Sequence, residues 1–255
     1  MKLTRRISLS LLAALAVTTL GVQARPVEDI KKAGTLIAAT EGQFAPFNFF
    51  EGKKLTGFEV DVAEAAAQKM GLKIQWKTVG FDALLTGLDQ NKWDLVIASH
   101  GITDERAKAV AFADPHYCTG GVIVSKGGAV KTAADLAGKK VSVQTGTSYL
   151  ENVQKVAGVK EVKNFPQDND ARGALATGRV DAWVTDKFVA KEALAKNGKG
   201  LAIGDFLFVE RVAAAVAKNN APLAAEFNKA LAAIQADGTY EKLSKKYFKE
   251  DIRCK

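Results

Sequence analysis

The sequence has few of the residues that most often carry metal or redox chemistry. It contains two histidines, two cysteines and two methionines in 255 residues. A histidine-based metal centre is therefore not expected. The glycine-rich loop of P-loop nucleotide-binding proteins and the nucleophile elbow of hydrolases are also missing. We accordingly expect no metal and no cofactor.

Long apolar runs are scarce too, and the only one lies at the start of the chain. Three cations within residues 2–6 precede an apolar stretch at residues 7–17, and small residues end the segment at position 24. This order predicts a cleavable secretory signal over residues 1–24, and hence a periplasmic protein. A membrane anchor is the alternative, but a span needs about 20 apolar residues. Because no cysteine lies near the cut, we expect no lipid anchor.

The excess of positive charge is small. The chain has 36 Lys and Arg against 28 Asp and Glu, and removal of residues 1–24 takes away three of the cations and none of the acids. The remaining cations alternate with acids along the predicted helices and do not cluster with aromatic residues. Nucleic-acid binding is therefore not expected.

The two cysteines, Cys118 and Cys254, both lie in the mature chain. In an oxidising compartment such a pair is a candidate disulfide, and two independent thiols are the alternative. A bridge would close a loop of more than 100 residues, worth roughly 4–5 kcal/mol in the chain-entropy account.

Strands and helices alternate along the mature chain, which predicts an α/β fold with parallel sheet units covered by helices. A strand at residues 35–39 is followed by a helix at 59–70, where Val62, Ala66 and Met70 share one face. The alternation restarts after residues 120–121. The other predicted strands are 73–79, 93–99, 121–125, 140–144, 161–165, 180–185 and 212–218, and the other helices are 81–89, one from about 103, 132–136, 148–156, 170–177, 187–196, 221–236 and 239–248.

A short pattern that occurs twice in the sequence suggests two similar halves. Residues 83–99 read as a helix, a glycine stop and a strand that ends on a polar residue, and residues 174–186 repeat that plan. Ligands of open α/β sheets bind outside the carboxyl ends of strands. Chance is the alternative, because helix–glycine–strand units are common.

The densest polar cluster lies at residues 97–108. Thr103 suits a helix N-cap, and Asp104 and Glu105 suit the first turn. Arg106 then lies near free backbone amides, where a ligand carboxylate would meet a guanidinium fork and N–H donors. Pairing of Arg106 with a surface acid is the simpler alternative.

A series of short motifs makes the chain resemble the polar amino-acid family of periplasmic solute-binding proteins. The motifs follow one another in order over nearly the whole mature chain. They are residues 40–47, 57–63, 81–84, 101–106, 112–115, 136–141, 144–148, 178–182 and 236–243.

The resemblance implies a two-lobed periplasmic-binding-protein-like fold of type II. Each lobe would be a mixed, mostly parallel sheet flanked by helices, and two crossover hinge strands would join the lobes. Lobe 1 would span residues 25–117 plus 210–255, and lobe 2 residues 118–209 with the hinge crossovers. The function implied is capture of an amino acid by lobe closure and delivery to the membrane permease of an ABC importer. We expect a monomer.

The resemblance also implies roles for individual residues at the ammonium and carboxylate of the ligand. Arg106 would clamp the carboxylate, helped by Thr147 or Ser148. Asp186 and the carbonyl of Ser99 would take the α-ammonium.

The rest of the ligand would meet aromatic and acidic side chains. Phe44 and Phe81 would sandwich its aliphatic or planar part, whereas Phe47 is predicted to be a core residue. Glu41 would lie near the ligand side chain or the ammonium, with a solvent-facing residue at a strand end as the alternative.

Two positions depart from the family pattern. Gly101 stands where the family usually has a Ser or Thr hydroxyl, so one ammonium acceptor is missing, and His100 replaces an apolar residue. Either His100 or Glu41 would compensate, or the ligand differs from a plain α-amino acid. Two acids in one cleft, Glu41 and Asp186, favour a polar or cationic ligand.

Two other functions are compatible with the same scaffold. Some members of the family are periplasmic dehydratases that act on small carboxylic acids, and such an enzyme needs a carboxyl with a raised pKa, such as Glu41 or Asp186. A receptor sensor module is the other, although no signalling domain or membrane segment follows the last helix. Binding without catalysis is the function we expect.

Overall fold

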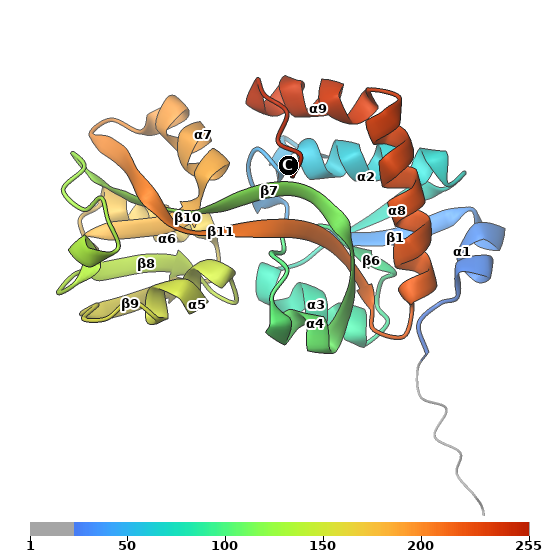
Figure 1. Ribbon diagram of the computed structural model, residues 1–255, viewed down its shortest axis with the longest axis horizontal. Coiled ribbons are helices and arrows are strands. Elements are labelled where there is room, and N and C mark those ends of the chain that lie inside the picture. The colour runs from blue at the N-terminus through green and yellow to red at the C-terminus, as the bar shows by residue number, and fades with distance from the viewer. Residues whose placement is uncertain (1–22, 255) are drawn as a thin grey trace, which may run out of the picture.

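The computed structural model describes residues 23–254, which form two α/β lobes lying side by side (Figure 1). The predicted signal over residues 1–24 lies almost entirely outside the described residues and stays a prediction. Within residues 23–254, no helix combines the length and the apolar character that a membrane span requires.

One eight-stranded sheet runs through both lobes in the order β5-β1-β6-β11-β7-β10-β8-β9. Within each lobe the neighbouring strands pair in parallel, and antiparallel pairs occur where β7 and β11 take part. This is the mixed, mostly parallel arrangement expected from the sequence. Lobe 1 holds β1 (Thr35–Thr40), β5 (Lys73–Thr78) and β6 (Leu95–Val96), and lobe 2 holds β8 (Lys140–Gln144), β9 (Glu161–Phe165) and β10 (Ala182–Asp186).

Two long antiparallel strands, β7 (Val110–Lys126) and β11 (Leu201–Ala217), cross from one lobe to the other (Figure 1). Their pairing is interrupted by register shifts between Ile203 and Ala215. The predicted lobe boundaries, near residues 117 and 210, fall within these two strands and stay a prediction.

Helices flank the sheet in both lobes. The helices of lobe 1 are α1 (Val27–Ala33), α2 (Phe58–Lys69), α3 (Phe81–Asp89), α4 (Asp104–Ala109), α8 (Ala221–Ala236) and α9 (Thr239–Phe248). Those of lobe 2 are α5 (Ser148–Gln154), α6 (Asp168–Ala176), α7 (Lys187–Asn197) and the 3-10 turn η1 (Ala134–Leu136). A small separate sheet of β2 (Gln43–Phe44), β3 (Asn48–Glu51) and β4 (Lys54–Thr56) lies in lobe 1.

The aromatic core of lobe 1 lies beside the crossover strands. Phe47 is fully buried, as predicted, and stacks on Tyr117 with 4.7 Å between the ring centroids. Phe58 packs edge-on against Tyr117 and Tyr240. These rings anchor the start of α2 and the loop after β2 to strand β7.

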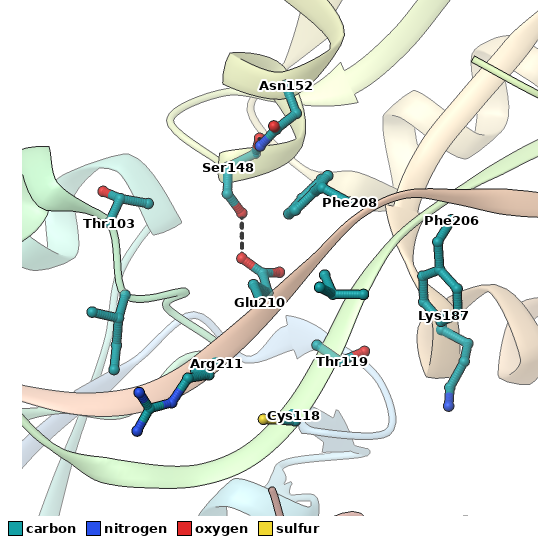
Figure 2. Close-up of a pocket in the computed structure, with 12 residues that line it drawn as sticks. Thr103, Cys118, Thr119, Ser148, Asn152, Lys187, Phe206, Phe208, Glu210 and Arg211 are labelled. Atoms are coloured by element: carbon teal, nitrogen blue, oxygen red, sulfur yellow. Dashed lines mark hydrogen bonds between the residues drawn. The ribbon is translucent and has the colours of Figure 1, made fainter. Parts of the chain in front are cut away.

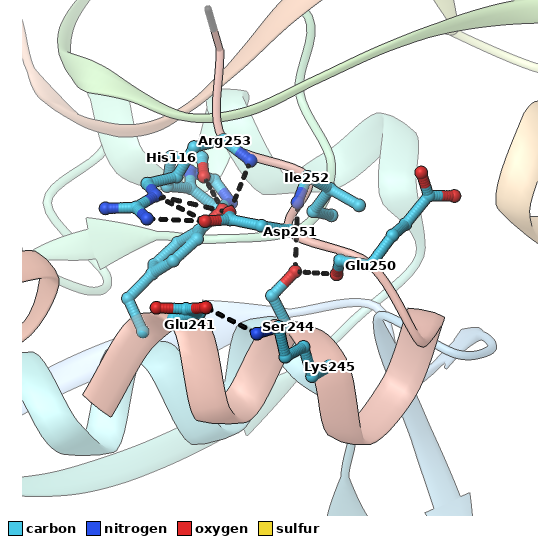
Figure 3. A network of polar contacts seen from close by, with 9 residues as sticks. His116, Glu241, Ser244, Lys245, Glu250, Asp251, Ile252 and Arg253 are labelled. Atoms are coloured by element: carbon cyan, nitrogen blue, oxygen red, sulfur yellow. Dashed lines mark hydrogen bonds and ion pairs between the residues drawn. The ribbon is translucent and has the colours of Figure 1, made fainter. Parts of the chain in front are cut away.

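The two cysteines form a disulfide bridge, with 4.8 Å between the Cα atoms of Cys118 and Cys254. Cys118 lies in the crossover strand β7, so the bridge ties the C-terminal tail to the hinge. Hydrogen bonds fold the same tail back onto α9 (Figure 3). In that network the hydroxyl of Ser244 donates to the carbonyl of Glu250 and accepts from the amide of Ile252.

Candidate functional site

A small internal void lies where the two lobes meet. Its lining includes six of the ten predicted ligand-binding residues. The lining residues are Glu41, Phe44, Phe81 and Ser99 from lobe 1, and Gln144, Thr147, Ser148 and Tyr149 from lobe 2. The void, at about 10 Å³ of space for the centre of a water molecule, has room for about one water. Entry of an amino acid therefore requires the lobes to move apart.

Direct hydrogen bonds join the lobes around this void. The Nε2 of Gln144 donates to the carboxylate of Glu41 over 2.6 Å, and an Arg106 nitrogen donates to the carbonyl of Gly146 over 2.9 Å. These contacts join the residue after β1 and helix α4, both of lobe 1, to the carboxyl end of β8 and the loop beyond it in lobe 2. The structure therefore describes a conformation in which the lobes are closed on each other.

Arg106 is held at the interface by the start of α4. The Thr103 hydroxyl caps this helix by accepting from the Arg106 amide. The guanidinium donates to the carbonyls of Gly101 and Gly146, both over 2.9 Å, and its carbon lies 5.7 Å from the centre of the Phe81 ring. Burial lowers the pKa of Arg106. Because its protein partners are carbonyl oxygens, the guanidinium is available for a ligand carboxylate.

Glu41 follows the carboxyl end of β1 and is 6% exposed. Burial raises the pKa of Glu41 to about 8, while the hydrogen bond from Gln144 lowers it and the carboxylates of Asp168 and Asp82 raise it further. The pKa of Asp168 is itself raised by burial, to about 6. Glu41 thus has acidic neighbours, and none of the residues lining the void is cationic.

Ser99 lies three residues after the end of β6, and its backbone has a positive φ of 57°. Its amide and hydroxyl both donate to Glu59, a fully buried carboxylate at the start of α2. The predicted strand at residues 93–99 is regular only over Leu95–Val96.

His100 and Gly101, the two departures from the family pattern, have different surroundings. The His100 ring is buried and stacks on Phe81 with 4.3 Å between centroids. Burial, with help from Arg106, keeps the pKa of His100 well below its usual value, so the ring is neutral. Gly101 lies beside the carboxylate of Glu210, and a Cβ atom at this glycine would be 2.0 Å from Glu210 Oε2.

Asp186, at the end of β10, is not among the residues that line the void. One carboxylate oxygen caps α7 by accepting from the amides of Phe188 and Val189, and the other accepts from the Thr119 hydroxyl over 2.5 Å. Burial raises the pKa of Asp186 to about 7. Its predicted contact with a ligand ammonium stays a proposal.

Thr147 and Ser148 open helix α5 on the lobe-2 side. The Thr147 hydroxyl caps this helix by accepting from the Leu150 amide, and it donates to the Gln144 carbonyl. The Ser148 hydroxyl donates to Glu210 over 2.7 Å (Figure 2). The hydroxyl of Ser148 thus reaches the crossover strand from the start of α5, and the role of Thr147 and Ser148 at a ligand carboxylate stays a prediction.

Sequence reasoning did not identify Gln144, Tyr149, Glu59 and Glu210 as site residues. Glu210 lies in the crossover strand β11 and lines a wider outer cleft of about 750 Å³ (Figure 2), but it does not line the inner void. Its only sequence signal is an acid in an otherwise mostly apolar stretch. Glu59 lies in the family motif at residues 57–63. The motif does not show that its carboxylate is buried, because that burial depends on long-range contacts.

The two-lobed α/β fold, with hinge strands and an interlobe site, defines a class of solute-binding proteins. The sequence profile of the bacterial extracellular solute-binding proteins, family 3, matches residues 36–250, and the chain belongs to this family. Its relatives are amino-acid-binding proteins of ABC transporters, and the chain is a solute-binding protein of this type.

Three relatives illustrate the likeness. The L-cystine-binding protein TcyJ of Escherichia coli (strain K12) is 37% identical over 89% of this chain and 87% of its own length. The L-arginine-binding protein of Pseudomonas aeruginosa is 34% identical over 96% and 97%. The structure of an ancestral arginine-binding protein bound to arginine has a TM-score of 0.81 at 42% identity, over 84% of this chain and 98% of the other.

Proposed function

We propose that this protein binds an amino acid with a cationic side chain in the periplasm and presents it to the permease of an ABC importer. Arg106 and the amides at the start of α5 take the ligand carboxylate. Glu41 takes the cationic end of the side chain, and Phe44 and Phe81 lie on either side of the apolar part between them.

The environment of Glu41 is the observation that carries this proposal. A carboxyl whose pKa is raised to about 8 by burial is costly to ionise in the closed conformation. A ligand cation beside it would offset that cost and favour its ionised form. The neighbouring carboxylates of Asp168 and Asp82 act in the same direction. A ligand with a neutral side chain would leave this cost in place.

Lobe closure then follows from contacts that only the closed conformation makes. Arg106 lies on lobe 1 and reaches the Gly146 carbonyl of lobe 2, and Glu41 reaches Gln144 in the same way. A ligand that inserts between these pairs touches both lobes at once. Such differential contact shifts the open–closed equilibrium toward the closed form.

L-cystine is the second candidate ligand. The 37% identical relative named above binds L-cystine. Cystine carries two zwitterionic ends, so its second ammonium would meet Glu41 in place of a side-chain cation. Arginine-binding relatives favour the first candidate.

Calorimetry on the purified protein tests the proposal. The ligand panel contains L-arginine, L-lysine, L-ornithine, L-histidine, L-cystine and L-glutamine. We expect tight binding of a cationic member, and Glu41→Gln should weaken it about 10-fold or more while leaving L-glutamine binding within about 3-fold. The control variant Glu51→Gln removes an exposed acid of β3 and should bind as the parent does. Preference for L-glutamine in the parent protein would refute the cationic assignment.

The same samples address catalysis and location. If NMR spectra of each bound ligand show turnover, the alternative of a dehydratase-type enzyme replaces pure binding. Mass spectrometry of protein from a periplasmic extract should find Arg25 as the first residue. An intact N-terminus on membrane-associated protein would contradict the cleaved signal.

A further inference from the structure

We propose that Glu210 supplies the ammonium-accepting oxygen that Gly101 lacks, so that the hinge strand β11 contributes directly to ligand binding. This inference rests on the proposed function, because it assigns to the α-ammonium of the same ligand an anionic partner in addition to Asp186, the partner predicted from the sequence.

The first observation is steric. A Cβ atom built on Gly101 would be 2.0 Å from Glu210 Oε2 and 2.9 Å from Glu210 Cδ. The carboxylate thus fills the space that the hydroxymethyl group of a serine at position 101 would occupy. A side chain at position 101 is therefore incompatible with the present position of the Glu210 carboxylate.

The second observation concerns the partners of the carboxylate. Oε2 accepts from the Ser148 hydroxyl over 2.7 Å, whereas Oε1 is buried and has no hydrogen-bond partner among residues 23–254. A buried carboxylate oxygen without a donor loses the hydrogen bonds that water would give it, which is unfavourable. A ligand ammonium would provide the missing donor.

The third observation is position. Glu210 lines the outer cleft, and its hydrogen-bond partner Ser148 lines both that cleft and the inner void. Figure 2 shows the Glu210 side chain rising from β11 toward Ser148, while Arg211 points to the opposite side. Burial raises the pKa of Glu210, whereas the hydrogen bond from Ser148 and the charge of nearby Arg106 lower it. Glu210 is therefore close to the site of the zwitterion head group.

A simpler role for Glu210 would be to balance the charge of Arg106. The two roles differ in what they predict for ligands. A carboxylate that only neutralises Arg106 competes with every ligand carboxylate, so its removal strengthens binding of all of them. A carboxylate that accepts the ammonium favours only ligands that carry an ammonium.

The experiment compares two probes, L-arginine and 5-guanidinopentanoate, which is the same molecule without its α-ammonium. Calorimetry is performed on the parent, Glu210→Gln, Glu210→Ala and the double variant Gly101→Ser with Glu210→Ala. Glu151→Gln is the matched control, because it removes a nearby acid of α5 that also interacts electrostatically with Arg106. Thermal unfolding confirms that each variant is folded.

We expect Glu210→Gln to weaken L-arginine binding about 10- to 100-fold, as for loss of a charge-assisted hydrogen bond, and to change 5-guanidinopentanoate binding less than about 3-fold. The Gly101→Ser change should restore about 10-fold of the L-arginine affinity that Glu210→Ala loses, because the serine hydroxyl fills the vacated space. The control should leave both affinities within about 3-fold.

Unchanged L-arginine binding by Glu210→Gln would overturn the inference, and so would tighter binding of both probes. If the parent protein prefers another amino acid of the panel, that amino acid and its deaminated analogue replace the two probes, and the inference is tested as before. If the parent binds no amino acid at all, the proposed function fails and the inference fails with it.

Discussion

The carboxylate of Glu59 holds both the backbone amide and the side-chain hydroxyl of Ser99, over 2.8 and 2.9 Å. The same carboxylate accepts from Asn48 over 3.0 Å and lies 2.9 Å from Nε2 of His116. Asn48 in turn accepts from the Gly42 amide next to Glu41. A buried acid of α2 thus positions two loops that end in the ligand site.

Replacement of Glu59 is therefore expected to destabilise the protein and disturb the site. Glu59→Ala leaves three buried donors without their acceptor, and we expect a loss of about 3–5 kcal/mol in the free energy of unfolding. Urea denaturation measures this loss. Glu64→Ala, which removes an exposed acid of the same helix, should cost less than about 1 kcal/mol. Equal midpoints for the two variants would contradict the role of Glu59.

Arg106 is expected to be necessary for binding, and its guanidinium shape to matter as well as its charge. Arg106→Lys keeps a positive charge but loses the planar fork that matches a carboxylate. We expect affinity for the preferred amino acid to fall about 30-fold or more, as measured by calorimetry. Lys108→Ala, on the same helix but exposed and paired with Glu105, should bind as the parent does. An Arg106→Lys protein of parental affinity would show that the carboxylate binds elsewhere.

The stability of the protein is expected to fall as the pH rises from about 4.5 to about 8. Burial raises the pKa of Glu41 from 4.5 to about 8, and that of Asp186 to about 7. In this window the folded protein retains protons that the unfolded chain releases, so linkage lowers the free energy of unfolding with rising pH. Denaturant titrations at several pH values measure the slope. Glu41→Gln should flatten it, and an unchanged slope would contradict the environment assigned to Glu41.

The disulfide is expected to contribute strongly to stability because it closes a long loop. Cys118 and Cys254 are 136 residues apart, which corresponds to about 5 kcal/mol in the chain-entropy account. The variant with both cysteines changed to serine should lose stability of this order in urea denaturation. Reductant should destabilise the parent and leave the variant unaffected. A change below about 1 kcal/mol would mean that the network of Figure 3 fixes the tail without the bridge.

Much of the local structure follows from the sequence pattern alone. The strands at residues 140–144 and 161–165 and the helices at 81–89, 221–236 and 239–248 lie where hydrophobic periodicity and glycine stops predict them. The two-lobed fold followed from a series of motifs, because many short signals in one order specify a family even when each is weak alone. Hydrophobic periodicity depends on neighbouring residues, and a family resemblance depends on the order of motifs along the chain. Both can be recognised in the sequence.

Contacts between distant segments were decided by the tertiary structure. The pairing of Cys118 with Cys254 was one of two alternatives until their Cα atoms were placed 4.8 Å apart. The sequence marked Gly101 as a position that lacks a hydroxyl, but it did not connect that glycine to Glu210, more than 100 residues away. Only packing of the crossover strand against the loop after β6 brings the two together, because a side chain and the space it fills come from separate parts of the chain.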